Sequence, residues 1–269
     1  LAEAAHSLGA RIFATEAAGF HFGRVLGQAV RESGADAVIY LSGAALPLMA
    51  LEEIAWICRA LAQGGPTVVV NNVQSADLVA WHPAAFLERV EPPENDNLLG
   101  WRLREAGMER VLIPHSAAIH FDLDTPTDYM ILALSGKGGP RIRAALREAA
   151  WPDERLRAAA DVLAAELPEV ALIGRVGSAI MEHFNRNLPV RLRVFSEERG
   201  MKALGREAAG LVRSVVADLV EDLGPERFFG RLSETCDAVF FDTRVLFANR
   251  GRRVSEWDRF HSDLGLADQ

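Results

Sequence analysis

The chain has 269 residues, of which 49% are hydrophobic and 25% charged, the composition of a soluble globular protein of one large or two average domains. Its formal net charge of −8 argues against general nucleic-acid or anionic-membrane binding. No apolar run approaches the roughly 20 residues of a membrane span, and no secretory signal is visible. Cys58 and Cys236 sit in apolar sequence, which predicts a buried, reduced pair and a cytoplasmic protein; a disulfide is the other reading.

Strand-like and helix-like segments alternate from the start of the chain to residue 134. This alternation predicts an α/β fold, with a mostly parallel sheet and helices on both of its faces. The expected strands are Arg11–Ala14, Ala37–Leu41, Thr67–Asn71 and Val111–Ile113, and the expected helices are Phe22–Glu32, Leu51–Leu61, Pro83–Val90 and Asn97–Ala106.

A polar segment that contains Asn71, Asn72 and Ser75 follows the predicted strand at residue 67. Loops at the carboxyl ends of parallel strands are where open α/β sheets bind ligands. The sequence therefore predicts that these three side chains contact the base, ribose or phosphate of a nucleotide. An equal alternative is a simple Asx turn, with Ser75 capping a short helix through Leu78.

Acidic side chains precede a helix start further along the chain. If His120–Asp124 is extended, Asp122 and Asp124 lie on the same face of the strand. Thr125-Pro126 is suited to cap and begin a helix, with Asp128 near its positive end. Carboxylates beside a helix N-terminus are suited to hold a cation and its phosphate. The alternative is that they only cap and solvate the junction.

Two passages of the chain resemble a known family. Phe121-Asp-Leu-Asp-Thr-Pro-Thr-Asp-Tyr129 is similar to the "FDIDTPEDL" segment of nucleotidyltransferases with a glycosyltransferase-A-like fold, such as phospholactate guanylyltransferases and molybdenum cofactor nucleotidyltransferases. Residues 19–61 resemble the "GFGASL…ADAVLVLLGDQPLL" passage of the same family. The resemblance covers residues 10–134. It implies a glycosyltransferase-A-like domain in which Asp124, with Asp122 beside it, helps to hold a magnesium ion.

The sequence departs from the pattern of this family at two places. The family's main magnesium ligand is an aspartate two places before a proline, and the matching residue here is Ala45, which has no oxygen to offer a hard cation. The family's glycine-rich "AAGxSxRMG" loop, whose amides hold the triphosphate, has no counterpart either. Either a segment precedes Leu1 in the protein or this branch has lost the loop.

The resemblance leaves two functions open. The first is a magnesium-dependent nucleotidyltransferase that joins an NMP from an NTP to a small phosphorylated acceptor, by in-line attack of an acceptor oxygen on the α-phosphate. The second is a catalytically degenerate relative that acts as a binding, regulatory or assembly protein. Asp122 and Asp124 favour the first, whereas Ala45 and the absent loop favour the second.

The glycine-rich segment Ser135–Pro140 is read as a linker between two domains, because it lacks the spacing of a phosphate-binding loop. The first domain is residues 1–134. The second, residues 141–269, is expected to be mainly helical with two or three strands and to pack on the first. Its expected elements include helices at Asp153–Glu166 and from Lys202 or Glu207 to Leu223, and strands at Val190–Phe195 and Asp237–Phe247.

Charged and polar residues interrupt these apolar segments. They form either an arginine-lined anion pocket or, as the sequence favours, a salt-bridge network within the helical half: Arg191, Arg193, Glu197, Glu198, Arg199, Arg213, Asp242, Thr243 and Arg244. The strand Asp237–Phe247 carries apolar residues on both faces, so it is expected to be buried in this chain or to pair across a homodimer. The tail Val254–Leu264 has the apolar spacing of a docking helix.

Overall fold

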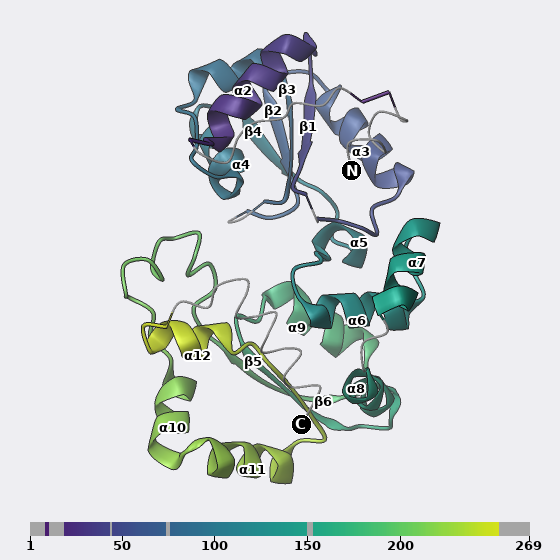
Figure 1. Ribbon diagram of the computed structural model, residues 1–269, viewed down its shortest axis with the longest axis vertical. Coiled ribbons are helices and arrows are strands. Elements are labelled where there is room, and N and C mark those ends of the chain that lie inside the picture. The colour runs from purple at the N-terminus through teal and green to yellow at the C-terminus, as the bar shows by residue number, and fades with distance from the viewer. Residues whose placement is uncertain (1–8, 11–18, 44, 74–75, 150–152, 253–269) are drawn as a thin grey trace. The chain divides into compact units, whose positions relative to one another are not determined.

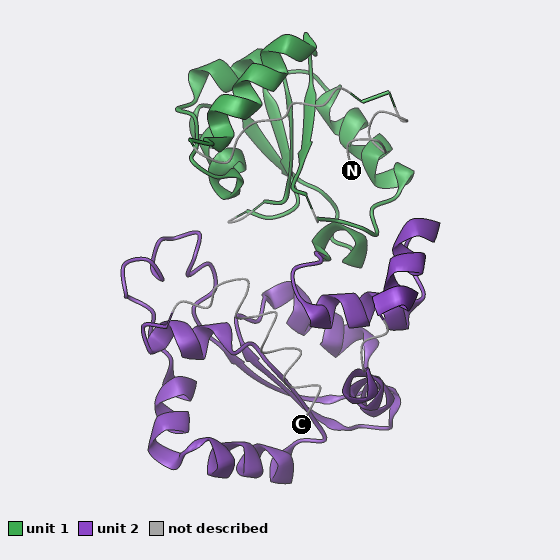
Figure 2. Ribbon diagram, in the orientation of Figure 1, with its two compact units in different colours: residues 1–121 green, residues 122–269 purple. Residues whose placement is uncertain are grey.

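The computed structural model describes residues 9–10, 19–43, 45–73, 76–149 and 153–252. The expected strand at Arg11–Ala14, the candidate Ser75 and the expected tail helix at Val254–Leu264 lie outside these residues. The chain divides into two compact units, residues 1–121 and residues 122–269 (Figure 2). Within the described parts of the chain, no helix is both long and apolar enough to span a lipid bilayer.

The first unit contains a mixed four-stranded sheet in the order β1-β3-β2-β4 (Figure 1). Its strands are β1 (Val38–Leu41), β2 (Thr67–Val70), β3 (Leu78–His82) and β4 (Glu109–Leu112). β2 and β4 are parallel, whereas β3 is antiparallel to both β1 and β2. The expectation of a mostly parallel sheet is therefore wrong for the first unit, because two of its three strand pairings are antiparallel. The strands β1, β2 and β4 nevertheless run in the same direction.

Helices cover both faces of this sheet, as the sequence predicts. They are α2 (Phe22–Ser33), α3 (Leu51–Leu61), η1 (Ala84–Arg89), η2 (Asp96–Leu98), α4 (Leu99–Glu105) and α5 (Ala117–His120), where η denotes a 3-10 helix. Successive residues of β2 and β3 point to opposite faces. Val68, Val70, Val79 and Trp81 pack with residues of α2, η1 and α4, while Val69, Leu78 and Ala80 pack with residues of α3 and α5.

Two details of the first unit differ from the sequence-based expectation. The strand β3 was not expected, and its residues Leu78 to Trp81 are buried on both faces because it lies inside the sheet. The expected helix at Pro83–Val90 is the 3-10 helix η1. At Gly100 in α4, an added Cβ would lie 2.7 Å from Cγ1 of Val70, so glycine allows this helix to approach β2 closely.

The second unit contains a three-stranded, fully parallel sheet in the order β6-β5-β7. Its elements are α6 (Pro126–Ser135), α7 (Pro140–Ala149), α8 (Glu154–Ala164), β5 (Glu169–Gly174), α9 (Ser178–Asn187), β6 (Arg191–Ser196), α10 (Val215–Leu223), α11 (Pro225–Thr235), β7 (Ala238–Phe241) and α12 (Arg244–Asn249). A mainly helical unit with three strands is what the sequence predicts. Residues of α10, α11 and α12 cover one face of the sheet, where Ala171 and Ile173 contact Val216, Phe228 and Leu246 (Figure 1).

Three expectations for this half are corrected. The long strand at Asp237–Phe247 ends at Phe241, and α12 follows it. The helix expected from residue 202 or 207 begins only at Val215, because three glycines with φ of 75°, 68° and 66° turn the chain at Gly200, Gly205 and Gly210. The division between the units falls at residue 121, not at residues 135–140, since α6 packs against α7 and α8.

The two cysteines are both free thiols. Cys58 is exposed on α3 and Cys236 is half-buried after α11. The expectation of a buried pair is therefore wrong, and the alternative of a disulfide is not what the structure contains.

Candidate functional site

The carboxyl edge of the first sheet joins two segments that are far apart in sequence. The backbone N–H of Leu46, which follows β1, donates a hydrogen bond of 3.1 Å to the carbonyl of Phe121, which follows β4 and α5. Ala45 immediately precedes Leu46, and Asp122 is the next residue after Phe121. The two passages that carry the family resemblance therefore meet at this edge of the first unit.

Asn71 stabilises the same edge through its side chain. The side chain is buried, and its Nδ2 donates to the carbonyl of Ile119 at 3.0 Å. Its Oδ1 accepts from the backbone N–H groups of Asp77 and Leu78, both at 3.1 Å. These bonds span six and seven positions, so Asn71 closes the whole loop from β2 to β3, whereas an Asx turn would bond only two residues further on. The neighbouring Asn72 is exposed.

Asp122 and Asp124 begin the second unit. The predicted extended segment from His120 is wrong at its start, because α5 ends at His120 as a helical turn. The predicted helix start is confirmed: Oγ1 of Thr125 accepts from the Asp128 N–H, and Oδ2 of Asp128 accepts from the N–H groups of Asp124 and Thr125 at 3.1 and 2.8 Å. Asp124 is exposed and Asp122 is half-buried.

Two histidines of the first unit stack on each other. A five-residue spacing on an extended strand predicts that His115 and His120 lie on opposite faces. The helical turn α5 overturns this prediction, and the ring centroids lie 4.4 Å apart with a 31° tilt. Burial, together with the nearby His115, holds the pKa of His120 below its ordinary value.

A resident magnesium ion does not fit these residues. Ala45 offers no oxygen at the position where the resemblance requires a carboxylate. Among the described residues, no three His, Cys, Asp or Glu side chains lie together as a metal-holding group. With Asp122 and Asp124 alone, the ion would need further oxygens, which magnesium usually takes from water and from substrate phosphates.

A groove of about 830 Å³ also lies in the first unit, between α2 and the η1 region. Its lining includes Gly23, Gly27, Arg24, Arg31 and Glu88. Apart from Gly23, which lies in the passage that carries the resemblance, these residues are not singled out by sequence, because glycines within a helix usually signal close packing rather than a ligand site. Gly23 does serve packing: an added Cβ would lie 2.7 Å from the backbone nitrogen of Pro93.

The carboxyl edge of the second sheet carries a cluster of charged side chains. Asp242, after β7, accepts from Nε of Arg175 at 2.7 Å and from Nε of Arg244 at 2.9 Å. Burial alone would raise the pKa of Asp242, but the two guanidiniums outweigh it and hold this pKa below its ordinary value. Asp242 and Arg244 were expected in either an anion pocket or a salt-bridge network, and they are ion-paired here.

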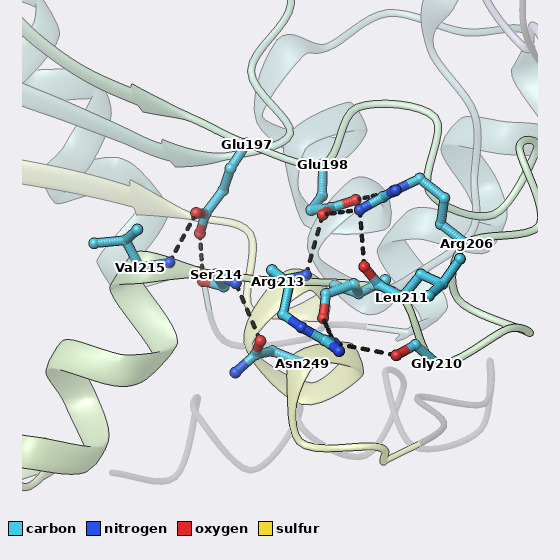
Figure 3. A network of polar contacts seen from close by, with 10 residues as sticks. Glu197, Glu198, Arg206, Gly210, Leu211, Arg213, Ser214, Val215 and Asn249 are labelled. Atoms are coloured by element: carbon cyan, nitrogen blue, oxygen red, sulfur yellow. Dashed lines mark hydrogen bonds and ion pairs between the residues drawn. The ribbon is translucent and has the colours of Figure 1, made fainter.

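A second polar network joins the end of β6 to the start of α10 (Figure 3). The carboxylate of Glu198 accepts two hydrogen bonds of 2.7 Å from Arg206 and one of 3.0 Å from the N–H of Arg213. The carboxylate of Glu197 accepts from the hydroxyl of Ser214 and from the N–H of Val215. These bonds fix the turn-rich segment 199–213 between strand and helix.

The remaining predicted arginines are also placed. Arg191 and Arg193 both pair with Glu169, at 3.3 and 3.2 Å, across the β5–β6 pairing. The guanidinium of Arg213 donates to the carbonyls of Gly210 and Val212. The salt-bridge network that the sequence favours is therefore confirmed for Arg191, Arg193 and the pair Asp242–Arg244. The guanidinium of Arg213 is an exception, because it binds backbone carbonyls.

A scan against models of protein families finds no match, and a search of curated protein sequences finds none either.

Proposed function

We propose that the first unit is a nucleotidyltransferase-like domain that binds a nucleoside triphosphate, and that the chain is a catalytically degenerate relative with a binding or regulatory role. The observation that carries this proposal is the hydrogen bond from Leu46 to Phe121. It brings together the two passages to which the resemblance assigns the nucleotide and its metal.

The degenerate reading rests on the chemistry of Ala45. This residue lies one position before Leu46 and lacks the carboxylate that the family uses. Without that ligand, magnesium is expected to arrive with the triphosphate, whose oxygens complete its coordination. Within the first unit, the exposed Asn72 is the side chain that we expect to contact the nucleotide.

The test restores the missing carboxylate. We expect Ala45→Asp to tighten the binding of a magnesium–NTP complex by about tenfold, as one added ion–carboxylate contact allows. Calorimetry with ATP, GTP, CTP and UTP identifies the base. Ala62→Asp is the matched control. Ala62 is exposed at the end of α3, so this substitution adds the same charge to the same unit at a position away from Ala45. Equal affinities for the wild type and Ala45→Asp would contradict the proposed place of Ala45.

A second candidate function is the active transferase, and the position of Asp124 favours it. Its backbone is fixed by the hydrogen bond to Asp128, and its carboxylate is exposed beside the start of α6. The check is transfer of label from an α-phosphate-labelled NTP to small phosphorylated acceptors, phospholactate among them. Transfer that disappears in Asp124→Asn would make the chain an enzyme; absence of transfer for every NTP keeps the binding role.

We also propose that the protein works in a reducing compartment such as the cytoplasm. The support is the state of Cys58 and Cys236, which are both unpaired thiols. An exposed thiol such as Cys58 is expected to stay reduced only where thiol reductants are present.

A further inference from the structure

The groove between α2 and the η1 region is a concave feature of the first unit, apart from the edge where Leu46 meets Phe121. Its volume of about 830 Å³ lies in the range of small-molecule sites. Gly34 and Ala35, which line it, precede β1, whereas Leu46 follows β1. The groove therefore reaches the opposite end of this strand, and the nucleotide proposed above does not account for it.

Backbone hydrogen bonds hold both ends of the groove together. The N–H of Gly23, in the first turn of α2, donates to the carbonyl of Pro93 at 2.9 Å. Beyond the other end of this helix, the N–H of Ala84 donates to the carbonyl of Asp36 at 2.7 Å. Between these points, apolar residues of α2 and η1 pack in one hydrophobic core. The groove is thus preformed by the packing of the unit.

Small residues line both walls of the groove and leave it hollow. On the α2 side, an added Cβ at Gly27 would meet, outside its own stretch of helix backbone, only Nη1 of Arg31 at 3.4 Å. On the η1 side, the lining residues are Ala84 and Ala85. Together with Val30, these residues give the groove an apolar floor that suits a small ring or a short carbon chain.

Two guanidinium groups line the same groove without a protein partner. Arg24 and Arg31 form no hydrogen bond or ion pair with any residue that the structure describes. The guanidinium of Arg31 reaches back over Gly27, the direction in which long side chains lean on a helix, and so stands beside the apolar floor. The acidic lining residue Glu88 forms no ion pair with either arginine within the described chain. Positive charge therefore exceeds negative charge in the lining.

From the cavity, its apolar floor and the two unpaired guanidinium groups beside it, we propose that this groove binds a small organic anion. Its carboxylate or phosphate contacts Arg24 and Arg31, and its apolar part lies on the floor. Guanidinium groups match the oxygens of both anions through paired hydrogen bonds. Because the Arg31 guanidinium lies over Gly27, only about 4.5 Å of helix separates it from the level of Arg24, so both can contact one anion.

The test is calorimetric titration of the full chain with phenyl phosphate, benzoate, orthophosphate and benzyl alcohol. Phenyl phosphate and benzoate carry both an anion and a ring, whereas orthophosphate lacks the ring and benzyl alcohol lacks the charge. We expect one ring-bearing anion to bind about tenfold or more tightly than either control compound, and its identity distinguishes a phosphate ligand from a carboxylate ligand. A control compound that binds as tightly as both ring-bearing anions would contradict the proposal.

Substitutions of the charged lining residues are expected to act in opposite directions. Arg31→Gln is expected to weaken binding of the preferred anion by about tenfold, since it removes a charge-assisted contact. Glu88→Gln is expected to tighten it, because it removes the negative charge of the lining. Arg59→Gln is the matched control, because Arg59 is exposed in the last turn of α3 in the same unit and does not line the groove. The control is expected to bind within about twofold of the wild type.

A further variant tests the space of the groove and not its charge. Gly27→Leu keeps every charged residue but places a side chain in the groove, and it is expected to fold, as thermal unfolding verifies, and to abolish binding. Unaltered affinity in both Arg31→Gln and Gly27→Leu would overturn the proposal. So would the absence of wild-type binding at roughly 10 mM of either ring-bearing anion. Binding is expected without magnesium and unchanged in Ala45→Asp, so failure of the nucleotide proposal does not imply failure of this one.

Discussion

Glu198 and Arg206 form a two-fold ion pair in which each carboxylate oxygen accepts a hydrogen bond of 2.7 Å from the guanidinium. Glu198 is nearly buried and has a φ of 54°, an unusual value for a residue with a side chain. Because Glu198 also accepts from the N–H of Arg213, one carboxylate joins the start of the segment 198–213 to two later residues, Arg206 and Arg213.

Glu198→Gln is expected to lower the free energy of unfolding of the second unit more than a surface substitution does, since both Arg206 and the N–H of Arg213 lose a charged acceptor. Urea denaturation measures the change. Glu182→Gln is the control, because Glu182 pairs with Arg186 on the surface of α9, and surface pairs contribute about 0–1 kcal/mol. Equal effects of the two substitutions would contradict the structural role of Glu198.

The carboxyl groups of Glu198 and Asp242 predict that the second unit loses stability in acid. The hydrogen bonds from Arg206 lower the pKa of Glu198, and the two arginines beside Asp242 overcome its burial and lower the pKa of that group as well. Carboxyls with lowered pKa stabilise the fold fully above their unfolded value of about 4, and this stabilisation is lost as pH falls through the folded value. Glu198→Gln is expected to reduce the loss of stability on acidification, and an unchanged acid transition would argue against this assignment.

The neighbouring residues Asn71 and Asn72 are expected to have different roles, the first in stability and the second in nucleotide binding. Asn71→Asp replaces the donor that faces the carbonyl of Ile119 by an oxygen, and it is expected to destabilise the first unit by about 1–3 kcal/mol. Asn72→Asp makes the same change at an exposed position and is expected to leave stability nearly unchanged while weakening NTP binding. Thermal unfolding and nucleotide titration of both variants test this, and equal unfolding temperatures would contradict it.

Two helical glycines of the first unit predict opposite effects of the same substitution. Gly100→Ala places a methyl group 2.7 Å from Val70 in a packed core and is expected to destabilise by about 1–3 kcal/mol. Gly27→Ala in α2 meets only the flexible end of Arg31 at 3.4 Å and is expected to stabilise by about 0.5–1 kcal/mol. Chemical denaturation of both variants is the measurement, and a shift of the same sign in both would refute the packing described for α4.

The stacked histidines predict that the stability of the fold depends on pH near neutrality. Burial, followed by the charge of His115, lowers the pKa of His120, so the unfolded chain takes up its proton at higher pH than the folded chain. Stability is therefore expected to fall as pH decreases from the ordinary histidine value of about 6.5 towards the folded value. His115→Ala is expected to raise the pKa of His120, as followed by NMR titration of its ring. A ring that titrates at the same pH in both proteins would contradict the coupling.

Some of this architecture follows directly from sequence. Thr67–Val70 forms a strand as the sequence predicts, and the Thr125 cap with Pro126 and Asp128 begins α6 as its composition predicts. These features succeed because they depend on a few adjacent residues. The run at Ala37–Leu41 reads as a buried strand, but β1 lies at the edge of the sheet and is only half-buried.

Features that depend on distant partners could not be predicted in this way. Val245 and Leu246 read as strand residues, but they pack in α12 against other parts of the second unit. Asn71 could be recognised as a turn residue, yet its contact with Ile119 spans 48 positions. The sequence groups Arg199 with either an anion pocket or a salt-bridge network, and only the fold places it against Gly177. Local propensity determines elements, while tertiary contacts determine these sites.

The measurement that tests the proposed function most directly is calorimetric titration of the wild-type chain with magnesium alone, with each NTP alone and with the two together. Because Ala45 supplies no ligand, the account predicts little binding of the bare ion and clear binding of one or more NTPs with magnesium. Tight binding of the bare ion would contradict the assigned role of Ala45, and the absence of binding for every magnesium–NTP complex would contradict the nucleotide-binding function itself.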